Sequence, residues 1–308
     1  MSLQAFVQTL LALLLAPAPS PAPSDERERP TAREKAALVV ISGLPAPTGV
    51  GGVFVRRWNT DAPRPPGTLV FVDQEGGEIR AFPELPPFAA ASAYGSAAEA
   101  EASGRATGRA LSRNGIHVDL APVLDSAGGP LGSRHFGRPG FALGFVRGLE
   151  STKTAACPKH FPGLGSAPLS TDNAPRVHAR VLEEELGAFR RAIGAGVRCV
   201  MLSHAFYRRF DGRRALTAPA AYRLLRRLGF EGVAITDSLS VVRARWPVWW
   251  ARRAALAGAD MLLFTSPHDA RRAIRALVPL ARRGALDDAV QRILKVRRSL
   301  GFSLPNGW

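Results

Sequence analysis

The feature that most constrains this chain is an alternation that begins at about residue 33. Short apolar runs rich in β-branched residues, which favour strands, alternate with longer Ala/Leu/Arg segments of helical periodicity. The runs cover residues 38–41, 50–55, 68–72, 117–123, 155–160, 197–203, 233–236 and 261–264. Eight strands that alternate with helices predict a single α/β domain, a (β/α)8 TIM-type barrel. A doubly wound sheet is the alternative.

Seven segments of helical periodicity accompany these strands. They cover residues 97–114, 141–152, 179–195, 218–228, 248–257, 270–283 and 286–300. Gly229, Gly258 and Gly301 stand where such helices would end. The first unit is expected to be irregular, because the Gly/Pro loop between the first two runs leaves no room for a helix. We therefore expect a barrel over residues 33–308, preceded by a signal-like segment and linker over residues 1–32.

The first 32 residues have a different composition. Residues 5–16 are apolar apart from Gln8 and Thr9, and a Pro/Ala/Ser tract and a charged run follow. Twelve residues are too few to span a bilayer as a helix, but they match the hydrophobic region of a secretory signal. No lysine or arginine precedes them, however, and the prolines make poor cleavage sites. Two interpretations stay open: export to an extracytoplasmic location, or a cytoplasmic protein with a disordered or misassigned start.

The net charge of +16 comes almost wholly from arginine, which supplies 37 of the 41 basic residues. The arginines fall mostly on the predicted helices without interleaved aromatic residues, so no nucleic-acid partner is expected. Attraction to an anionic cell-wall polymer or lipid fits the charge, and peripheral membrane or wall association stays open. The chain is expected to be a monomer.

The two cysteines, Cys157 and Cys199, each lie inside an apolar strand-like run. Neither shows metal-ligand spacing or belongs to a disulfide framework, so both are expected to be free buried thiols. They do not indicate a compartment.

Polar residues stand at the ends of five consecutive strands, where a barrel of this type carries its working side chains. The residues are Asp73, then Asp119, Asp125 and Arg134, then Lys159 and His160, then Ser203 and His204, and finally Asp237. One pocket lined by such groups offers a carboxylate nucleophile among fixed hydrogen-bond donors and acceptors, which suits a hydroxyl-rich substrate. In the alternative interpretation these residues are helix caps and loop salt bridges.

Other kinds of site have no support in the sequence. It contains no metal-ligand cluster, phosphate-binding glycine loop, dinucleotide fingerprint, or serine or cysteine nucleophile motif. No metal and no cofactor are therefore expected.

The motifs at these strand ends resemble the successive signatures of glycoside hydrolase family 3. They are Asp73-Gln74-Glu75-Gly76-Gly77, Ala121-Pro122-Val123-Leu124-Asp125, Arg134-x-Phe136-Gly137, Lys159-His160-Phe161-Pro162-Gly163 and Gly232-Val233-x-Ile235-Thr236-Asp237-Ser238-Leu239. The resemblance runs from about residue 35 to residue 302. It is closest to the single-domain β-N-acetylglucosaminidase (β-N-acetylhexosaminidase) branch, which acts on peptidoglycan fragments.

This resemblance implies an O-glycoside hydrolase that retains configuration and acts on β-linked N-acetylglucosamine through a covalent glycosyl-enzyme. Asp237 matches the nucleophile. The residues that match those gripping the sugar are Asp73, Arg134, Lys159 and His160. His204 is expected to be a partner of these residues rather than the acid. Two arginines of the branch are replaced here by Glu78 and Ala81. Arg80 is expected to reach the space that those arginines occupy.

The sequence departs from the branch at its general acid/base, an Asp-x-His dyad on the loop after the Lys-His strand. Asp172 matches the aspartate, but Ala174 stands in place of the histidine, and Leu164 replaces another histidine. Loss of acid/base assistance costs about 10²–10⁴-fold in rate. Asp172 itself could act if loop closure desolvates it. His178 is a second candidate, although it is expected to begin the next helix.

Three functions follow from this departure. The first is a glycosidase that retains its chemistry with an altered acid. The second is a catalytically impaired barrel that binds sugar or cell wall, and the third is a glycoside phosphorylase, in which phosphate resolves the intermediate in place of water.

Overall fold

The computed structural model of the chain describes residues 30–240 and 247–302. Residues Thr31–Leu304 form one compact unit. The predicted signal-like segment and linker lie almost wholly outside the described residues. Their boundary at residue 32 therefore stays a prediction.

Eight parallel strands form the centre of this unit. They are β1 (Val40–Gly43), β2 (Gly52–Val55), β3 (Leu69–Val72), β6 (Val118–Asp119), β7 (Ala155–Ala156), β9 (Cys199–Leu202), β12 (Val233–Thr236) and β13 (Leu262–Phe264). Six of them pair in the order β13-β1-β2-β3-β6-β7, and β12 pairs with β9. Single bridges from Phe161 to Leu202 and from Ile235 to Met261 join the two sets into a ring. The predicted (β/α)8 barrel is confirmed.

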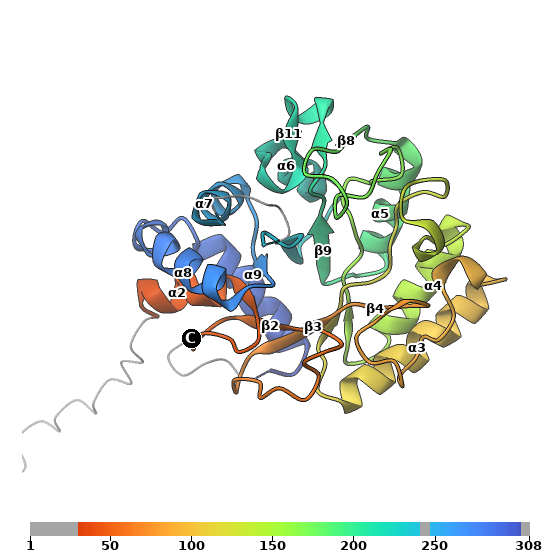
Figure 1. Ribbon diagram of the computed structural model, residues 1–308, viewed down its shortest axis with the longest axis horizontal. Coiled ribbons are helices and arrows are strands. Elements are labelled where there is room, and N and C mark those ends of the chain that lie inside the picture. The colour runs from red at the N-terminus through yellow and green to blue at the C-terminus, as the bar shows by residue number, and fades with distance from the viewer. Residues whose placement is uncertain (1–29, 241–246, 303–308) are drawn as a thin grey trace, which may run out of the picture. The chain divides into compact units, whose positions relative to one another are not determined.

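The helices follow the strands round this ring (Figure 1). They are α3 (Ala97–Arg113), α4 (Pro139–Glu150), α5 (Glu183–Gly194), α6 (Pro219–Arg227), α7 (Pro247–Ala257), α8 (Pro267–Arg282) and α9 (Asp287–Ser299). All seven predicted helices are confirmed. The strands are buried along their whole length, as expected for parallel strands covered on both sides.

The first unit is irregular, as predicted, because β1 passes to β2 through residues 44–51 without a helix. A helix that was not predicted, α2 (Ala32–Leu38), precedes β1 and packs on α8. Thr31 and Glu34 form a capping box at its start, which is the local signal for this helix. Among the described residues, no helix combines the length and apolarity needed to cross a bilayer.

Short elements lie within the loops at the rim of the barrel. They are the hairpin β4 (Gln74–Gly76) and β5 (Ile79–Arg80), the small sheet of β8 (His178–Ala179), β10 (Phe206–Tyr207) and β11 (Arg213–Arg214), and the 3-10 turns η1 (Ala91–Ala93), η2 (Gly132–Arg134), η3 (Arg208–Phe210) and η4 (Ala215–Thr217). The expectation that His178 begins a helix is wrong. His178 pairs with Phe206 in parallel and its ring stacks on the Phe206 ring, so α5 begins only at Glu183.

The expectation that the two cysteines are free thiols is also wrong. Cys157, directly after β7, forms a disulfide with Cys199, the first residue of β9. The two Cα atoms are 4.4 Å apart although 42 residues separate them in sequence. The barrel places their strands side by side, which cysteine spacing cannot reveal.

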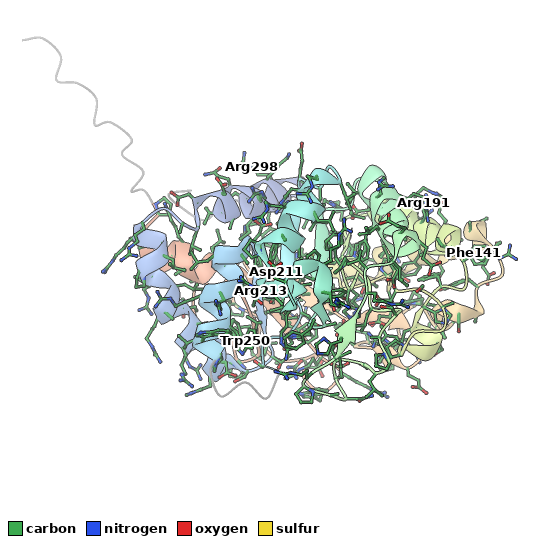
Figure 2. The ribbon with its side chains drawn as sticks, turned by 90° about the horizontal axis from the view of Figure 1, so that it is seen from above. Phe141, Arg191, Asp211, Arg213, Trp250 and Arg298 are labelled. Atoms are coloured by element: carbon green, nitrogen blue, oxygen red, sulfur yellow. A yellow bond between two sulfur atoms is a disulfide. The ribbon has the colours of Figure 1, made fainter. Side chains whose placement is uncertain are left out.

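Many arginines of the helices point outward. Figure 2 shows Arg191 of α5 and Arg298 of α9 at the edge of the unit, and both are exposed. The positive charge therefore lies largely on the outer surface of the helical layer.

Candidate functional site

The strand-end residues meet at one rim of the barrel. Asp73 follows β3, Lys159 and His160 follow β7, and Asp237 follows β12, while Arg134 ends η2 in the loop after β6. Because the strands are parallel and the ring is closed, their carboxyl ends face the same side. The structure therefore brings together segments that lie far apart in the sequence.

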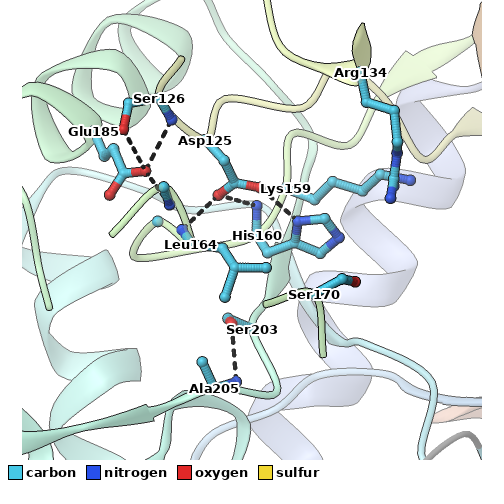
Figure 3. Close-up of polar contacts among 12 residues, drawn as sticks. Asp125, Ser126, Arg134, Lys159, His160, Leu164, Ser170, Glu185, Ser203 and Ala205 are labelled. Atoms are coloured by element: carbon cyan, nitrogen blue, oxygen red, sulfur yellow. Dashed lines mark hydrogen bonds and ion pairs between the residues drawn. The ribbon is translucent and has the colours of Figure 1, made fainter. Parts of the chain in front are cut away.

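An ion cluster around Glu75 is the most rigid part of this rim. Arg134 donates from Nε and Nη2 to the two carboxylate oxygens of Glu75, at 2.7 and 2.8 Å. Lys159 Nζ lies 2.5 Å from Glu75 and donates to Asp73 at 2.6 Å. Figure 3 shows the side chains of Lys159 and Arg134 extending toward the same place. A bidentate arginine and a shared lysine fix the donors geometrically.

Charge balance keeps this cluster ionised. Burial by itself raises the pKa of Glu75, but the charges of Lys159 and Arg134 outweigh burial and lower that pKa to about 2. Burial lowers the pKa of Lys159, and the carboxylates of Asp73 and Glu75 more than compensate, so its pKa is raised. Asp119 lies fully buried nearby, and burial raises its pKa well above the ordinary value.

His160 is oriented by a buried carboxylate. Asp125 lies 2.7 Å from His160 Nδ1 and also accepts hydrogen bonds from the backbone N–H groups of His160 and Leu164, at 3.3 and 2.7 Å (Figure 3). An ionised carboxylate only accepts hydrogen bonds, so Nδ1 carries the proton in this contact. The Nε2 atom has no hydrogen-bond partner in the described ranges and can meet a ligand there.

Asp237 stands at the end of β12 without an ion-pair partner among the described residues. Its Oδ1 accepts a hydrogen bond from the N–H of Ser238 at 2.7 Å, and its own N–H donates to the carbonyl of Leu202. Burial raises its pKa, but electrostatic interactions with His204 and His160 and the hydrogen bond from Ser238 outweigh burial, and the net shift is downward. The group is an ionised carboxylate, available to a ligand.

His204, at the end of β9, is a buried neighbour of Asp237. Its Nε2 must donate to the carbonyl of Ser238, 2.7 Å away, so this nitrogen is protonated. Its Nδ1 has no hydrogen-bond partner in the described part of the chain. Burial lowers the pKa of His204, which favours the neutral ring. The supporting role expected for His204 stays a prediction.

Asp172 is carried by the loop over residues 164–177 and is exposed. Its backbone N–H donates to Ser170 Oγ at 3.2 Å, and Ser170 itself is buried. The charge of Asp172 contributes to raising the pKa of Arg134, and it opposes the lowering of the pKa of His204. The carboxylate therefore lies within electrostatic reach of the site.

Two buried side chains attach this loop to the barrel. Arg214 donates to the carbonyls of His204 and Pro175, at 2.7 and 2.5 Å, and its guanidinium lies 4.4 Å from the centre of the Phe206 ring. Glu185, in the first turn of α5, accepts from the N–H of Gly165 at 2.8 Å. Neither anchor is predicted from the sequence, because arginine pairs and acidic helix starts are common in this chain.

Arg80, a predicted substrate-binding residue, is held within its own hairpin. Its Nε donates to the carbonyl of Gly77 at 2.8 Å, and its Nη1 donates to the carbonyl of Pro83 at 2.5 Å. The structure shows no bond from Arg80 to the Glu75 cluster in the part it describes. Sequence reasoning missed Glu75 as a site residue, although the Asp73-Gln74-Glu75 motif at a strand end contained the signal. Within the described ranges no group of acidic, histidine or cysteine residues could hold a metal ion.

Known proteins resemble this chain in sequence and in fold. Residues 56–296 match the glycosyl hydrolase family 3 N terminal domain. A beta-hexosaminidase of Vibrio cholerae is 30% identical over 225 residues, which cover 66% of this chain and 67% of that protein. The solved beta-N-acetylhexosaminidase of Beutenbergia cavernae is 28% identical, with a TM-score of 0.77 over 88% of this chain and 99% of that chain. A family 3 beta-N-acetylglucosaminidase of Paenibacillus is 25% identical, with a TM-score of 0.80. The match covers 90% of this chain and 64% of that longer chain.

Proposed function

The chain belongs to glycosyl hydrolase family 3 and is a glycosidase, and we propose that it releases β-linked N-acetylglucosamine with retention of configuration, through a glycosyl ester on Asp237. The observation that carries this proposal is the state of Asp237. It is ionised, it has no ion pair among the described residues, and it shares a barrel rim with Lys159 and His160. The names of the similar proteins supply the sugar.

The residues of the rim have separate proposed roles in substrate binding and in catalysis. Asp73, Lys159, Arg134 and His160 hold the sugar hydroxyls, because each presents a polar group at the rim and three of them are fixed by ion pairs. Asp237 attacks the anomeric carbon and displaces the leaving-group oxygen, which takes up a proton. Water then cleaves the ester, giving its proton to a base and leaving the sugar free.

Asp172 is the proposed proton donor in the first step and the base in the second. It stands on a loop, within electrostatic reach of Arg134 and His204. Closure of the loop would remove water from the carboxylate, and loss of water favours the protonated form. The absence of a histidine at Ala174 predicts slower turnover than a complete dyad would give.

The test is covalent trapping. A 5-fluoro or 2-deoxy-2-fluoro glycosyl fluoride should add one glycosyl mass to the intact chain, and peptide mass spectrometry should place it on Asp237. Asp237→Asn should form no adduct and should lose turnover of p-nitrophenyl N-acetylglucosaminide. Failure of the wild type to form any adduct would contradict a covalent mechanism.

A second candidate is a sugar-binding barrel with little catalysis, and it is favoured by Ala174 and by the exposure of Asp172. Calorimetry with muropeptides would then show binding without turnover. Turnover that depends on inorganic phosphate would instead indicate a phosphorylase.

Peptidoglycan fragments are the proposed substrate class, and a monomer is the proposed oligomeric state.

An extracytoplasmic location is proposed on two grounds. The Cys157–Cys199 disulfide is a bond that persists in oxidising compartments, and the apolar segment of residues 5–16 matches a secretory signal. Mass spectrometry of the chain from fractionated cells tests the location, and recovery only from the cytoplasmic fraction would contradict it.

A further inference from the structure

An exposed stripe on α7 combines apolar and basic side chains. Trp249 and Leu256 are 45% and 61% exposed, although both are large apolar residues. Arg252 and Arg253 are exposed between them, at positions three and four after Trp249. Residues three, four and seven apart lie on one face of a helix, so the four side chains form a single stripe. The guanidinium of Arg253 lies 4.4 Å from the centre of the Trp249 ring.

A positively charged groove adjoins the end of this stripe. It has a volume of about 510 Å³ and is lined by residues at the ends of α6 and α7 and at the start of α9, including Leu256. Arg223 and Arg227 face it, and neither has an ion-pair or hydrogen-bond partner among the residues that the structure describes. Its other two arginines, Arg226 and Arg292, bind the buried Asp260, at 2.6 and 3.0 Å.

The charge of the groove favours an anion. Its four arginines outnumber Asp260 and Asp288, the two acids in the lining, so the net charge is +2. The rest of its floor consists largely of alanines from residues 255–259 and 285–289. An amphiphilic anion therefore matches both the charge and the apolar surface better than a free polar anion does.

The groove lies away from the catalytic rim. Asp260 precedes β13, and α6 and α7 run antiparallel to the strands, so their last turns lie at the amino ends of the strands. A partner bound in the groove leaves the carboxyl-end rim with Asp237 open, although the stripe itself extends to Trp249 in the first turn of α7. An inference about this surface does not depend on the proposed substrate or mechanism.

We propose that the α6–α7 face, defined by Arg223, Arg227, Trp249, Arg252, Arg253 and Leu256, docks on the surface of an anionic lipid bilayer. Tryptophan and leucine among arginines are typical of groups that enter the headgroup region, and guanidinium groups bind lipid phosphates. A soluble polyanion such as a wall polymer would engage the arginines but would gain nothing from Trp249 and Leu256. The bilayer is therefore the partner that accounts for the whole face.

The experiment measures binding of the full chain to sedimented vesicles. Phosphatidylcholine vesicles with and without phosphatidylglycerol are compared at physiological salt, so binding by any other apolar segment is subtracted. Arg252→Glu with Arg253→Glu should weaken the phosphatidylglycerol-dependent binding at least about 30-fold, since each arginine contributes about 1 kcal/mol near such a surface. Arg190→Glu with Arg191→Glu on α5, two exposed arginines with the same charge change, is the matched control and should bind nearly as wild type.

A second pair of variants tests the apolar part. Trp249→Ser with Leu256→Ser should lower binding about tenfold, whereas Trp58→Ser, at a more exposed tryptophan in the loop after β2, should not. Turnover of a soluble aryl glycoside should be unchanged in the Arg252/Arg253 variant, which shows that it folds. Thermal unfolding shows that the Trp249/Leu256 variant folds, because the Trp249 ring packs on Trp250 beside the loop anchor Arg214. Equal losses in the two arginine pairs, or no preference of the wild type for phosphatidylglycerol, would overturn the proposal. If the Trp249/Leu256 variant binds as the wild type does and soluble polyphosphate competes with the vesicles, the face is a site for a soluble polyanion. That result would contradict the proposal that the partner is a lipid bilayer.

Discussion

The carboxylate of Glu75 lies 2.5 Å from Nζ of Lys159, and both side chains are only 3% exposed. Burial of either charge alone would cost folding free energy. Arg134, which binds Glu75, and Asp73, which binds Lys159, add one further charge of each sign, so the cluster of four residues is neutral. The arrangement holds the lysine and arginine rigidly at the rim, where a sugar would meet them.

Glu75→Gln should therefore destabilise the fold and weaken catalysis together. Removal of one partner from a buried ion pair costs about 3–5 kcal/mol, because the other charge is left uncompensated. Urea unfolding measures the loss. Glu78→Gln is the control, because Glu78 is exposed in the same hairpin and makes no described bond. Equal stability of the two variants would contradict the role of Glu75.

Ala174→His should raise turnover by about 10²-fold on substrates with poor leaving groups, because these need a proton donor most. The gain should be small for aryl glycosides whose leaving group departs without a proton. The measurement is kcat on both substrate types. Asn173→His places the same residue one position away, and an equal gain there would show that the effect does not come from the dyad position.

Arg214→Met should lower kcat about 10²-fold and change KM much less, because the variant frees the loop that carries Asp172 without removing a group that touches the sugar. Arg214→Lys should restore only part of the activity, since an ammonium group does not span the two carbonyls as a planar guanidinium does.

Arg213→Met is the control for Arg214. Arg213 is adjacent and exposed on β11, and Figure 2 shows it near Asp211. Steady-state kinetics and limited proteolysis of the loop after Leu164 measure the effect. A parallel loss of activity in both variants, or unchanged kcat in Arg214→Met, would rule out the anchoring role.

The contribution of Glu185 to the stability of the wild type should fall as pH rises toward neutrality. Burial raises the pKa of Glu185 from 4.5 to about 7. A raised pKa means that the folded state binds the proton more tightly than the unfolded state does. The stabilisation is therefore complete below pH 4.5 and is lost as pH rises through about 7, up to about 3 kcal/mol.

Glu185→Gln should remove this part of the pH dependence while keeping an oxygen for the N–H of Gly165. Unfolding free energies measured across this pH range provide the test. Glu184→Gln, at an exposed neighbour on the same helix, should leave the slope unchanged. A slope that persists in Glu185→Gln would assign the effect to another group.

Cys157→Ala should destabilise the chain by about 4 kcal/mol, because the disulfide closes a loop of 42 residues in the unfolded state. Cys199→Ala and the double variant should show the same loss, since either change removes the same bond. Thermal unfolding with and without a reductant is the measurement. Identical unfolding of the wild type in both buffers would show that the bond is not formed.

The order of elements was predictable from local pattern. Apolar runs such as residues 233–236 and the helical segments after them predict the (β/α)8 barrel, because period and composition report burial on one or both sides of an element. The polar residues that follow the runs, Asp73, Lys159 and Asp237 among them, were predictable for the same reason. A parallel barrel directs every such strand end to one rim.

The tertiary structure decided which side chains meet. Glu75 reaches Arg134 and Lys159, Cys157 pairs with Cys199, and Arg214 joins His204 to the loop at Pro175. Each contact crosses between separate strands or loops, and its distance depends on strand order and register. Periodicity within one segment carries no information on that register, so these contacts follow only from the closed barrel.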